Sequence, residues 1–156
     1  MPTYQLPYGR RTLSLHLDTV AHVEQILPSH TEGCGDPHRA IAQALAAPIG
    51  LSSLGAFAGA RSVAIAINDK TRPVPHADIL PPLLAALGEL GIARDAITLI
   101  IATGTHIPMQ PDTFAQVVPT EIADRYWIIS HDCDAQDLVQ RGSTSRGTPV
   151  AMNRRY

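Results

Sequence analysis

Strong net charge and long apolar runs are both lacking in this sequence. Lysine and arginine number 12 against 14 aspartates and glutamates, so the formal charge is −2 with neutral histidines. The basic residues form pairs such as Arg10-Arg11 and Arg154-Arg155, not the stripe that nucleic-acid binding needs. No stretch approaches the ~20 apolar residues of a membrane span. We therefore expect neither a nucleic-acid partner nor a membrane partner.

Cysteines and targeting signals are also scarce. Cys34 and Cys133 are the only cysteines, and two cysteines do not make a disulfide framework. The chain begins Met1-Pro2-Thr3-Tyr4, without the basic segment and apolar core of a signal peptide. A reduced, cytoplasmic chain is therefore the expectation.

Three widespread enzyme motifs are missing. The sequence has no G-x-x-x-x-G-K-[ST] run, which gives no support to a P-loop NTPase. It has no G-x-G-x-x-G after a strand and no G-x-S-x-G elbow. A standard dinucleotide-binding fold and an α/β-hydrolase therefore have no direct signal.

The composition that is present is typical of a folded domain. Hydrophobic residues make up 45% and charged residues 17% of the 156, which suits one domain over residues 1–156 with its own core. The 13 prolines and 11 glycines gather between apolar runs. This pattern predicts many short elements joined by tight turns.

The apolar runs predict a parallel sheet. Residues 62–68 and 97–102 are short, β-branched runs typical of strands that are buried on both faces, and residues 126–130 form a third strand. Helical patterns over residues 79–90 and 111–118 separate them. Strands alternating with helices predict an α/β, Rossmann-like three-layer domain with a mostly parallel sheet and right-handed crossovers.

The residues before this sheet carry weaker signals. Leucines alternate from Thr12 to Leu17, which predicts a half-buried strand, and residues 20–27 form a weaker segment before a polar loop. Asp36 is a suitable N-cap for a helix that begins at Pro37 and that Pro48 ends. A second, short helix is predicted over residues 51–60.

Two further details concern the long helix and the end of the chain. Pro81 and Pro82 fit the helix over residues 79–90 only within its first turn, and Gly91 is a suitable stop. The segment from Gly147 to Tyr156 shows no obvious closing element.

Chemistry-bearing residues follow the first buried strand. Asp69, Lys70, Thr71 and Arg72 come directly after it, and prolines then stiffen the loop. An arginine fork can grip a carboxylate or a phosphate, and Asp69 can orient that arginine or a histidine. The plainer alternatives are that Asp69 and Thr71 cap the turn and that Arg72 covers a sheet edge with its stem.

A second polar loop follows the next strand. Gly104 permits close backbone approach, and Thr103 and Thr105 offer hydroxyls. His106 is the side chain in this loop that can take and give a proton near neutral pH, although it can also be an ordinary loop histidine. Ligands of open parallel sheets bind beyond the carboxyl ends of the strands. If the two strands are neighbours, both loops face one site.

Other histidines and cysteines are weaker candidates. The run from His131 to Asp134 and the spaced set of His30, Cys34 and His38 contain metal-ligand types. Adjacent residues rarely wrap one ion, so a metal site is not expected at the run from His131. A zinc site is not expected at the spaced set in its glycine-containing loop either. His16 is expected to face solvent from its strand, and His76 to help start its helix.

The two polar loops resemble a known family. Asp69-Lys-Thr-Arg-Pro-Val-Pro75 is similar to the D-x-T-R-P-x-P segment of the lactate racemase family. Ala102-Thr-Gly-Thr-His106, followed by Pro108, is similar to that family's A-T-G-x-H-x-P segment. Matches around Leu6-Pro-Tyr8, Pro48-Ile-Gly50 and His131-Asp132 keep the order and spacing along essentially the whole chain.

The resemblance implies a specific chemistry. Family members racemise or epimerise 2-hydroxy acids by reversible hydride transfer to a nickel-pincer nucleotide, and two histidines alternate as base for the substrate hydroxyl. His106 falls on one of these histidines. Arg72 falls on the arginine that holds the substrate carboxylate, and Asp69 on its acidic neighbour. Thr71, Thr103, Gly104 and Thr105 are the candidate cofactor contacts, with Asp69 beside them.

The resemblance also implies missing parts. The second base, the lysine that tethers the cofactor and the histidine that ligates nickel match no residue of this chain. We therefore expect a fragment of a longer two-domain protein that is inactive alone and needs the missing C-terminal part as its partner. The alternative is a stand-alone α/β module that binds a carboxylate or phosphate without catalysis.

Overall fold

A computed structural model of the chain describes residues 3–17 and 22–155. The chain forms two compact units, Met1–Gly33 and Cys34–Tyr156. None of the helices in the described ranges is both long enough and apolar enough to span a bilayer.

The first unit is an antiparallel hairpin. Strand β1 (Thr3–Tyr8) pairs with β2 (Arg11–His16), and Gly9 takes a φ of +59° in the turn. The predicted strand at residues 12–17 is confirmed, but the expectation of half-burial is wrong, because Leu13 and Leu15 are 48% and 39% exposed. Strand β1 was not predicted, since Pro7 lacks the backbone donor of a ladder residue and obscures the alternation. His16 is exposed on β2, as expected.

The second unit contains the predicted parallel sheet. Strands β3 (Val63–Ile67), β4 (Ile97–Ile101) and β5 (Trp127–Ser130) lie in the order β3-β4-β5. Both pairs are parallel, and the register sets Ile67 opposite Ile101 and Ile101 opposite Ser130. The α/β class is therefore confirmed, and all three strands end at one edge of the sheet.

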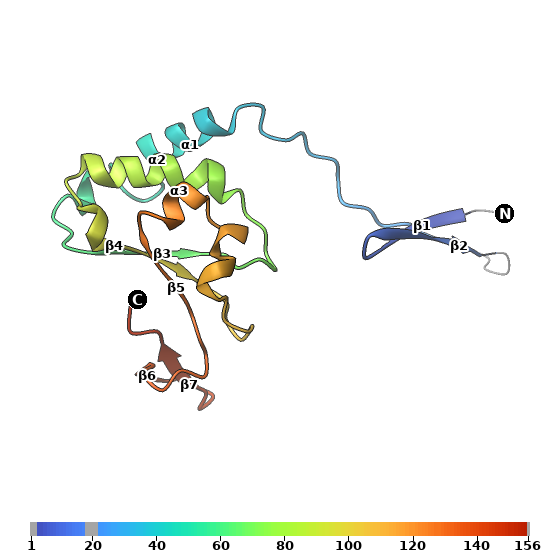
Figure 1. Cartoon of the computed structure of the whole chain (residues 1–156). Coiled ribbons are helices and arrows are strands. Elements are labelled where there is room, and N and C mark those ends of the chain that lie inside the picture. The colour runs from blue at the N-terminus through green and yellow to red at the C-terminus, as the bar shows by residue number, and fades with distance from the viewer. Residues whose placement is uncertain (1–2, 18–21, 156) are drawn as a thin grey trace. The chain divides into compact units, whose positions relative to one another are not determined.

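The helices of this unit lie on one side of the sheet (Figure 1). They are α1 (Pro37–Ala46), α2 (His76–Glu89) and α3 (Thr120–Ala123), with short 3₁₀ segments at Leu54–Phe57, Arg94–Ala96 and Pro111–Gln116. Helix α1 packs on α2. The opposite sheet face bears the exposed Ala64, Ala66 and Trp127, so the second covering layer of a three-layer domain stays a prediction.

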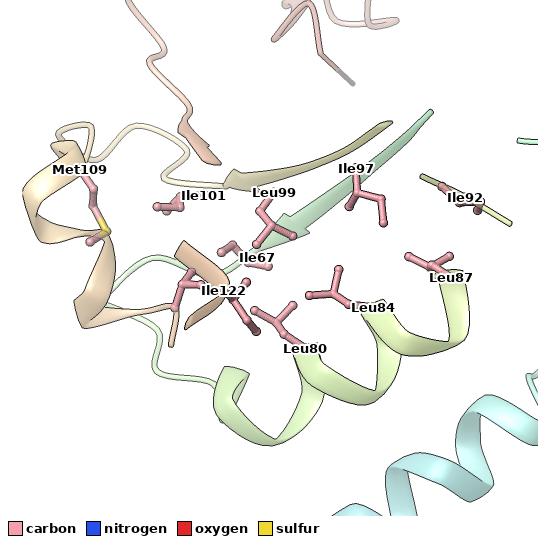
Figure 2. Packing of buried hydrophobic residues seen from close by; sticks show 11 residues of the cluster. Ile67, Leu80, Leu84, Leu87, Ile92, Ile97, Leu99, Ile101, Met109 and Ile122 are labelled. Carbon is pink, nitrogen blue, oxygen red and sulfur yellow. The ribbon is translucent and has the colours of Figure 1, made fainter. Parts of the chain in front are cut away.

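The core lies between α2 and the sheet (Figure 2). Leu80, Leu84 and Leu87 of α2 point toward strand residues that include Ile67 and Leu99. Strand β4 is buried on both faces, as predicted, because it is the central strand. The same prediction is wrong for β3, an edge strand on which side chains alternate between buried and exposed.

Helix α2 begins earlier than its prolines suggested. His76 is its first residue, so Pro81 and Pro82 lie beyond the first turn and the prediction is wrong. Pro81 leaves the carbonyl of Ala77 without its helical donor, and the exposure of Ala77 lets water replace that donor. The predicted stop is confirmed: Gly91 has a φ of +81°, and Ile92 N donates to Leu87 O at 3.2 Å, as in a Schellman motif.

Smaller elements mix confirmed and corrected predictions. Asp36 caps α1 by accepting from Arg39 N at 3.0 Å, and the helix ends just before Pro48. The helix predicted over residues 51–60 is only the short turn Leu54–Phe57, because glycines interrupt it. Residues 139–152 form an unpredicted antiparallel pair, β6 (Val139–Ser143) and β7 (Pro149–Met152). The segment after Gly147 therefore contains a strand that its sequence did not predict.

Candidate active site

Two backbone turns present the polar loops at the carboxyl edge of the sheet. After β3, Arg72 N donates to Asp69 O at 3.2 Å. After β4, His106 N donates to Thr103 O at 3.0 Å, and Gly104 between them takes a φ of +60° that favours glycine. Ala102 N donates to Ile67 O at 2.8 Å, which holds the two loops side by side.

Asp69 and His106 join the two loops through a short side-chain contact. Asp69 Oδ2 lies 2.7 Å from His106 Nδ1. The Asp69 side chain is 6% exposed, whereas that of His106 is 49% exposed. A buried carboxylate therefore holds one nitrogen of an imidazole whose ring reaches solvent.

The second carboxylate oxygen of Asp69 belongs to its own loop. Thr71 donates to Asp69 Oδ1 through its backbone N at 3.1 Å and through its hydroxyl at 2.7 Å. The first bond makes the turn that sequence reasoning gave as the plainer role of Asp69. Asp69 therefore both caps its turn and holds the histidine.

The pKa of Asp69 reflects this environment. Burial is the largest single influence on the pKa and acts to raise it. The hydrogen bond from the Thr71 hydroxyl, the bond from His106, the Thr71 backbone N–H and the charge of His106 together lower the pKa below the ordinary aspartate value. The carboxylate is consequently ionised at neutral pH and can accept from the imidazole.

A surface hollow of about 530 Å³ adjoins the pair. It is lined by residues 69–71, 105–110 and Thr113, so Asp69, Thr71, Thr105 and His106 share it. This volume is large enough for a small organic acid.

Arg72 lies apart from this contact. Its side chain is exposed, and Nη1 donates to Thr71 O at 3.3 Å. Within the described part of the chain it forms no ion pair with Asp69, so the carboxylate orients the histidine and not the arginine. Most of the guanidinium donors remain available to a ligand.

The two threonines of the loop after β4 differ in burial. Thr103 is 2% exposed, and its hydroxyl donates to the carbonyl of His131 at 2.6 Å, which ties the β4 loop to the end of β5. Thr105 is exposed. The bond from Thr103 to the His131 carbonyl could not be predicted from the sequence, because a backbone acceptor does not depend on the type of residue.

The structure also describes the histidines, cysteines and aspartates that were weaker candidates for a site. Ligand atoms of Asp132, Cys133 and Asp134 lie within 4.8 Å of one another, without the His131 side chain. Cys34 and Cys133 are free thiols. His76 starts α2 as expected, but it is also buried, with Nδ1 2.8 Å from Val117 O. This contact fastens α2 to the segment after β4.

Comparison with known proteins identifies the family. Residues 8–156 match the family described as the lactate racemase N-terminal domain. The chain belongs to this family. A lactate racemase of Lactiplantibacillus plantarum is 29% identical over 161 residues, which cover 99% of this chain. The resemblance that the two polar loops indicated is thereby confirmed.

A solved structure supports the fold. The lactate racemase apoprotein of Thermoanaerobacterium thermosaccharolyticum superposes with a TM-score of 0.78 at 24% identity over 97% of this chain. The chain spans 37% of the Lactiplantibacillus protein and 36% of the Thermoanaerobacterium chain. Both relatives are therefore much longer than the 156 residues of this sequence.

Proposed function

We propose that this chain is the N-terminal part of a 2-hydroxy acid racemase or epimerase, in which His106 is one of two bases. The observation that carries the proposal is the 2.7 Å contact between His106 Nδ1 and the buried carboxylate of Asp69. The family membership supports the reaction class, because a relative that covers the whole chain is named a lactate racemase.

The contact prepares His106 to take a proton. An ionised Asp69 accepts from Nδ1–H, so the neutral imidazole keeps its lone pair on Nε2. In the proposed step the substrate hydroxyl transfers its proton to Nε2, and the hydrogen on the carbinol carbon leaves with its electron pair as a hydride, for which the bound cofactor would be the acceptor. The imidazolium that forms gains a charge-assisted hydrogen bond to Asp69. The same proton returns to the oxygen in the reverse step.

Arg72 is the proposed anchor of the substrate carboxylate. Its guanidinium is exposed on the loop that carries Asp69, and one Nη contacts a backbone carbonyl. The remaining donors match the two oxygens of a carboxylate in a bidentate arrangement. An anchor at the carboxylate fixes the adjacent carbinol relative to His106.

The residues present are compatible with the nickel-pincer nucleotide that the family resemblance implies. When bound, this cofactor supplies the acceptor for the substrate hydride. Lys70 and the exposed hydroxyl of Thr105 lie in the hollow beside His106, and both suit the oxygen atoms of a nucleotide. Thr71 and Gly104 are the further proposed contacts, together with Asp69. Thr103, whose buried hydroxyl donates to the His131 carbonyl, is proposed to serve the cofactor only by holding the loop. The Lys70 ammonium and the Thr105 hydroxyl are hydrogen-bond donors for anionic oxygens and are not nickel ligands. The lysine that tethers the cofactor and the histidine that ligates nickel are proposed to come from the rest of the longer protein.

Hydride transfer makes a prediction that proton abstraction does not. The test uses the full-length, cofactor-loaded protein and lactate carrying deuterium at C2, in ordinary water. We expect both enantiomers to form with the deuterium retained at C2, because a hydride carried by a cofactor does not exchange with solvent. Loss of deuterium to water during interconversion would contradict the proposal. The 156-residue chain alone is expected to give no interconversion.

A further inference from the structure

Thr71 lies between the two members of the Asp69–His106 pair. Its hydroxyl oxygen is 2.7 Å from Asp69 Oδ1 and 3.3 Å from His106 Nδ1. The backbone N of Thr71 also reaches Asp69 Oδ1, at 3.1 Å. Thr71 therefore contacts both groups that the proposed proton transfer uses, although its side chain faces solvent.

The protons around Nδ1 can be assigned by elimination. If the Thr71 hydroxyl donated to Nδ1, that nitrogen would present a lone pair to Asp69 Oδ2 at 2.7 Å. Two lone pairs facing each other at this distance repel, and the lowered pKa of Asp69 excludes a protonated carboxyl at neutral pH. The hydroxyl must therefore donate to Asp69 Oδ1. Nδ1 then carries a hydrogen that donates to Oδ2 and weakly to the Thr71 oxygen.

The arrangement also fixes the rotation of the carboxylate. Two donors from Thr71 hold Oδ1 in place, which leaves Oδ2 directed at the imidazole. A carboxylate held by only one donor turns more freely about its terminal torsion, which is broad and two-fold. The hydroxyl of Thr71 thus restricts the partial rotation that would turn the carboxylate away from Nδ1 and break its bond to His106.

We propose that Thr71 is a positioning residue that holds His106 in the Nδ1–H tautomer and so keeps Nε2 free as the base. The catalytic value of this tautomer rests on the proposed function, but the tautomer itself does not. The single hydroxyl proton is used by Asp69, so any contact of Thr71 with a cofactor employs only its oxygen as an acceptor.

The test is nitrogen NMR of the histidine side chains in the 156-residue chain. Imidazole ¹⁵N shifts distinguish a nitrogen that bears hydrogen from one that does not. We expect wild-type His106 to be almost wholly the Nδ1–H form. Thr71→Val should populate both tautomers, because it keeps the backbone donor and removes the hydroxyl. Thr71→Ser should restore the single form.

A matched control comes from the same hollow. The hydroxyl of Thr113 donates to Gln110 O at 2.7 Å and, among the described residues, forms no hydrogen bond with Asp69 or His106. Thr113→Val should therefore leave the His106 tautomer unchanged, and unaltered amide spectra of the strands will verify the fold of each variant. A Thr71→Val chain that keeps the pure Nδ1–H form would overturn the positioning role, as would a Thr71→Ser chain that fails to restore it.

The kinetic counterpart separates this inference from the proposed function. In the full-length loaded protein, Thr71→Val should lower kcat roughly fivefold with little change in KM, the rate equivalent of one ordinary hydrogen bond. If the tautomer stays pure in Thr71→Val while His106→Gln stops racemisation, only the role of Thr71 is wrong. If the tautomers mix while His106→Gln racemises normally, the positioning role stands and the proposed function is wrong.

Discussion

Asp69→Asn is the substitution that isolates the contact between Asp69 and His106. The asparagine Oδ1 can still accept both Thr71 donors, which reach the wild-type Oδ1 at 3.1 and 2.7 Å. The amide nitrogen replaces Oδ2 and donates where the carboxylate accepted. His106 Nδ1 must then act as the acceptor, so the ring hydrogen moves to Nε2 and the proposed base is blocked.

The expected cost to folding is small. A hydrogen bond to a charged group contributes about 1.5–3 kcal/mol, and the low end applies because the His106 side chain is 49% exposed. A neutral hydrogen bond of about 1 kcal/mol replaces it, and removal of a buried charge offsets part of the remainder. A net loss of at most about 0.5 kcal/mol lowers Tm by roughly 1–2 °C in a chain of this size.

Two assays decide whether this reasoning holds. Thermal unfolding should show only the small change, whereas ¹⁵N NMR should show the His106 hydrogen on Nε2. In the full-length loaded protein, racemisation should fall by about 10²- to 10⁴-fold, the usual contribution of a general base. A fall in Tm above about 10 °C, well beyond the loss of one hydrogen bond, or an Nε2 that stays free of hydrogen, would refute this assignment of roles.

The remaining predictions concern pH, substrate binding and the core. Folding lowers the pKa of Asp69, so the stabilisation from its ionised carboxylate is complete above the unfolded pKa near 4 and is lost as the pH falls through the lowered pKa. In urea melts at a series of pH values, the free energy of unfolding of Asp69→Asn should therefore fall less steeply at acid pH than that of wild type. Arg72→Ala should reduce kcat/KM for a hydroxy acid by roughly 10- to 100-fold, because charged hydrogen bonds to the substrate are lost. Arg39 is exposed on α1, and Arg39→Ala should change kcat/KM little. Neither substitution should change thermal stability. Leu99→Ala should cost about 3 kcal/mol in a urea melt, because Leu99 is 0% exposed at the centre of the sheet; a loss under about 1 kcal/mol would contradict the packing described.

The sheet and its functional edge could be predicted from apolar runs alone. The runs ending near Ile67, Ile101 and Ser130 are short and β-branched, and the intervening helical patterns favour parallel pairing. Parallel pairing of neighbouring strands brings the residues after each strand to one edge. For this reason the apolar pattern predicts that the loops of Asp69 and His106 face one site if their strands are neighbours, and the pairing of β3 with β4 meets that condition.

The side-chain arrangement at that edge could not be predicted in the same way. The sequence leaves open whether Asp69 orients the arginine or the histidine, because its pattern does not specify which of the two the carboxylate faces. The two donors of Thr71 to Asp69 Oδ1 decide the matter, because they leave Oδ2 directed at His106. Such a choice depends on backbone torsions that no residue pattern specifies.

Elements without clean periodicity were the ones that sequence reasoning missed. Strand β6 reads Val-Gln-Arg-Gly-Ser and is mostly exposed, so it offers no apolar face to detect. Pro7 interrupts the strand pattern of β1, so β1 was not predicted. Pro81 and Pro82 led to a predicted start of α2 that is too late in the sequence. The conformation of each of these segments is determined more by the strand or helix that it pairs or packs with than by the intrinsic propensity of its residues.

His106→Gln in the full-length, cofactor-loaded protein tests the central claim most directly. Glutamine keeps an N–H for the Asp69 carboxylate but cannot accept a proton as a base, and His38→Gln on the exposed surface of α1 is the matched control. The measurement is the initial rate of interconversion of lactate enantiomers, followed from each enantiomer in turn. We predict a loss of at least about 10²-fold for His106→Gln and a wild-type rate for His38→Gln. A His106→Gln protein that interconverts the enantiomers within a few-fold of the wild-type rate would contradict the account.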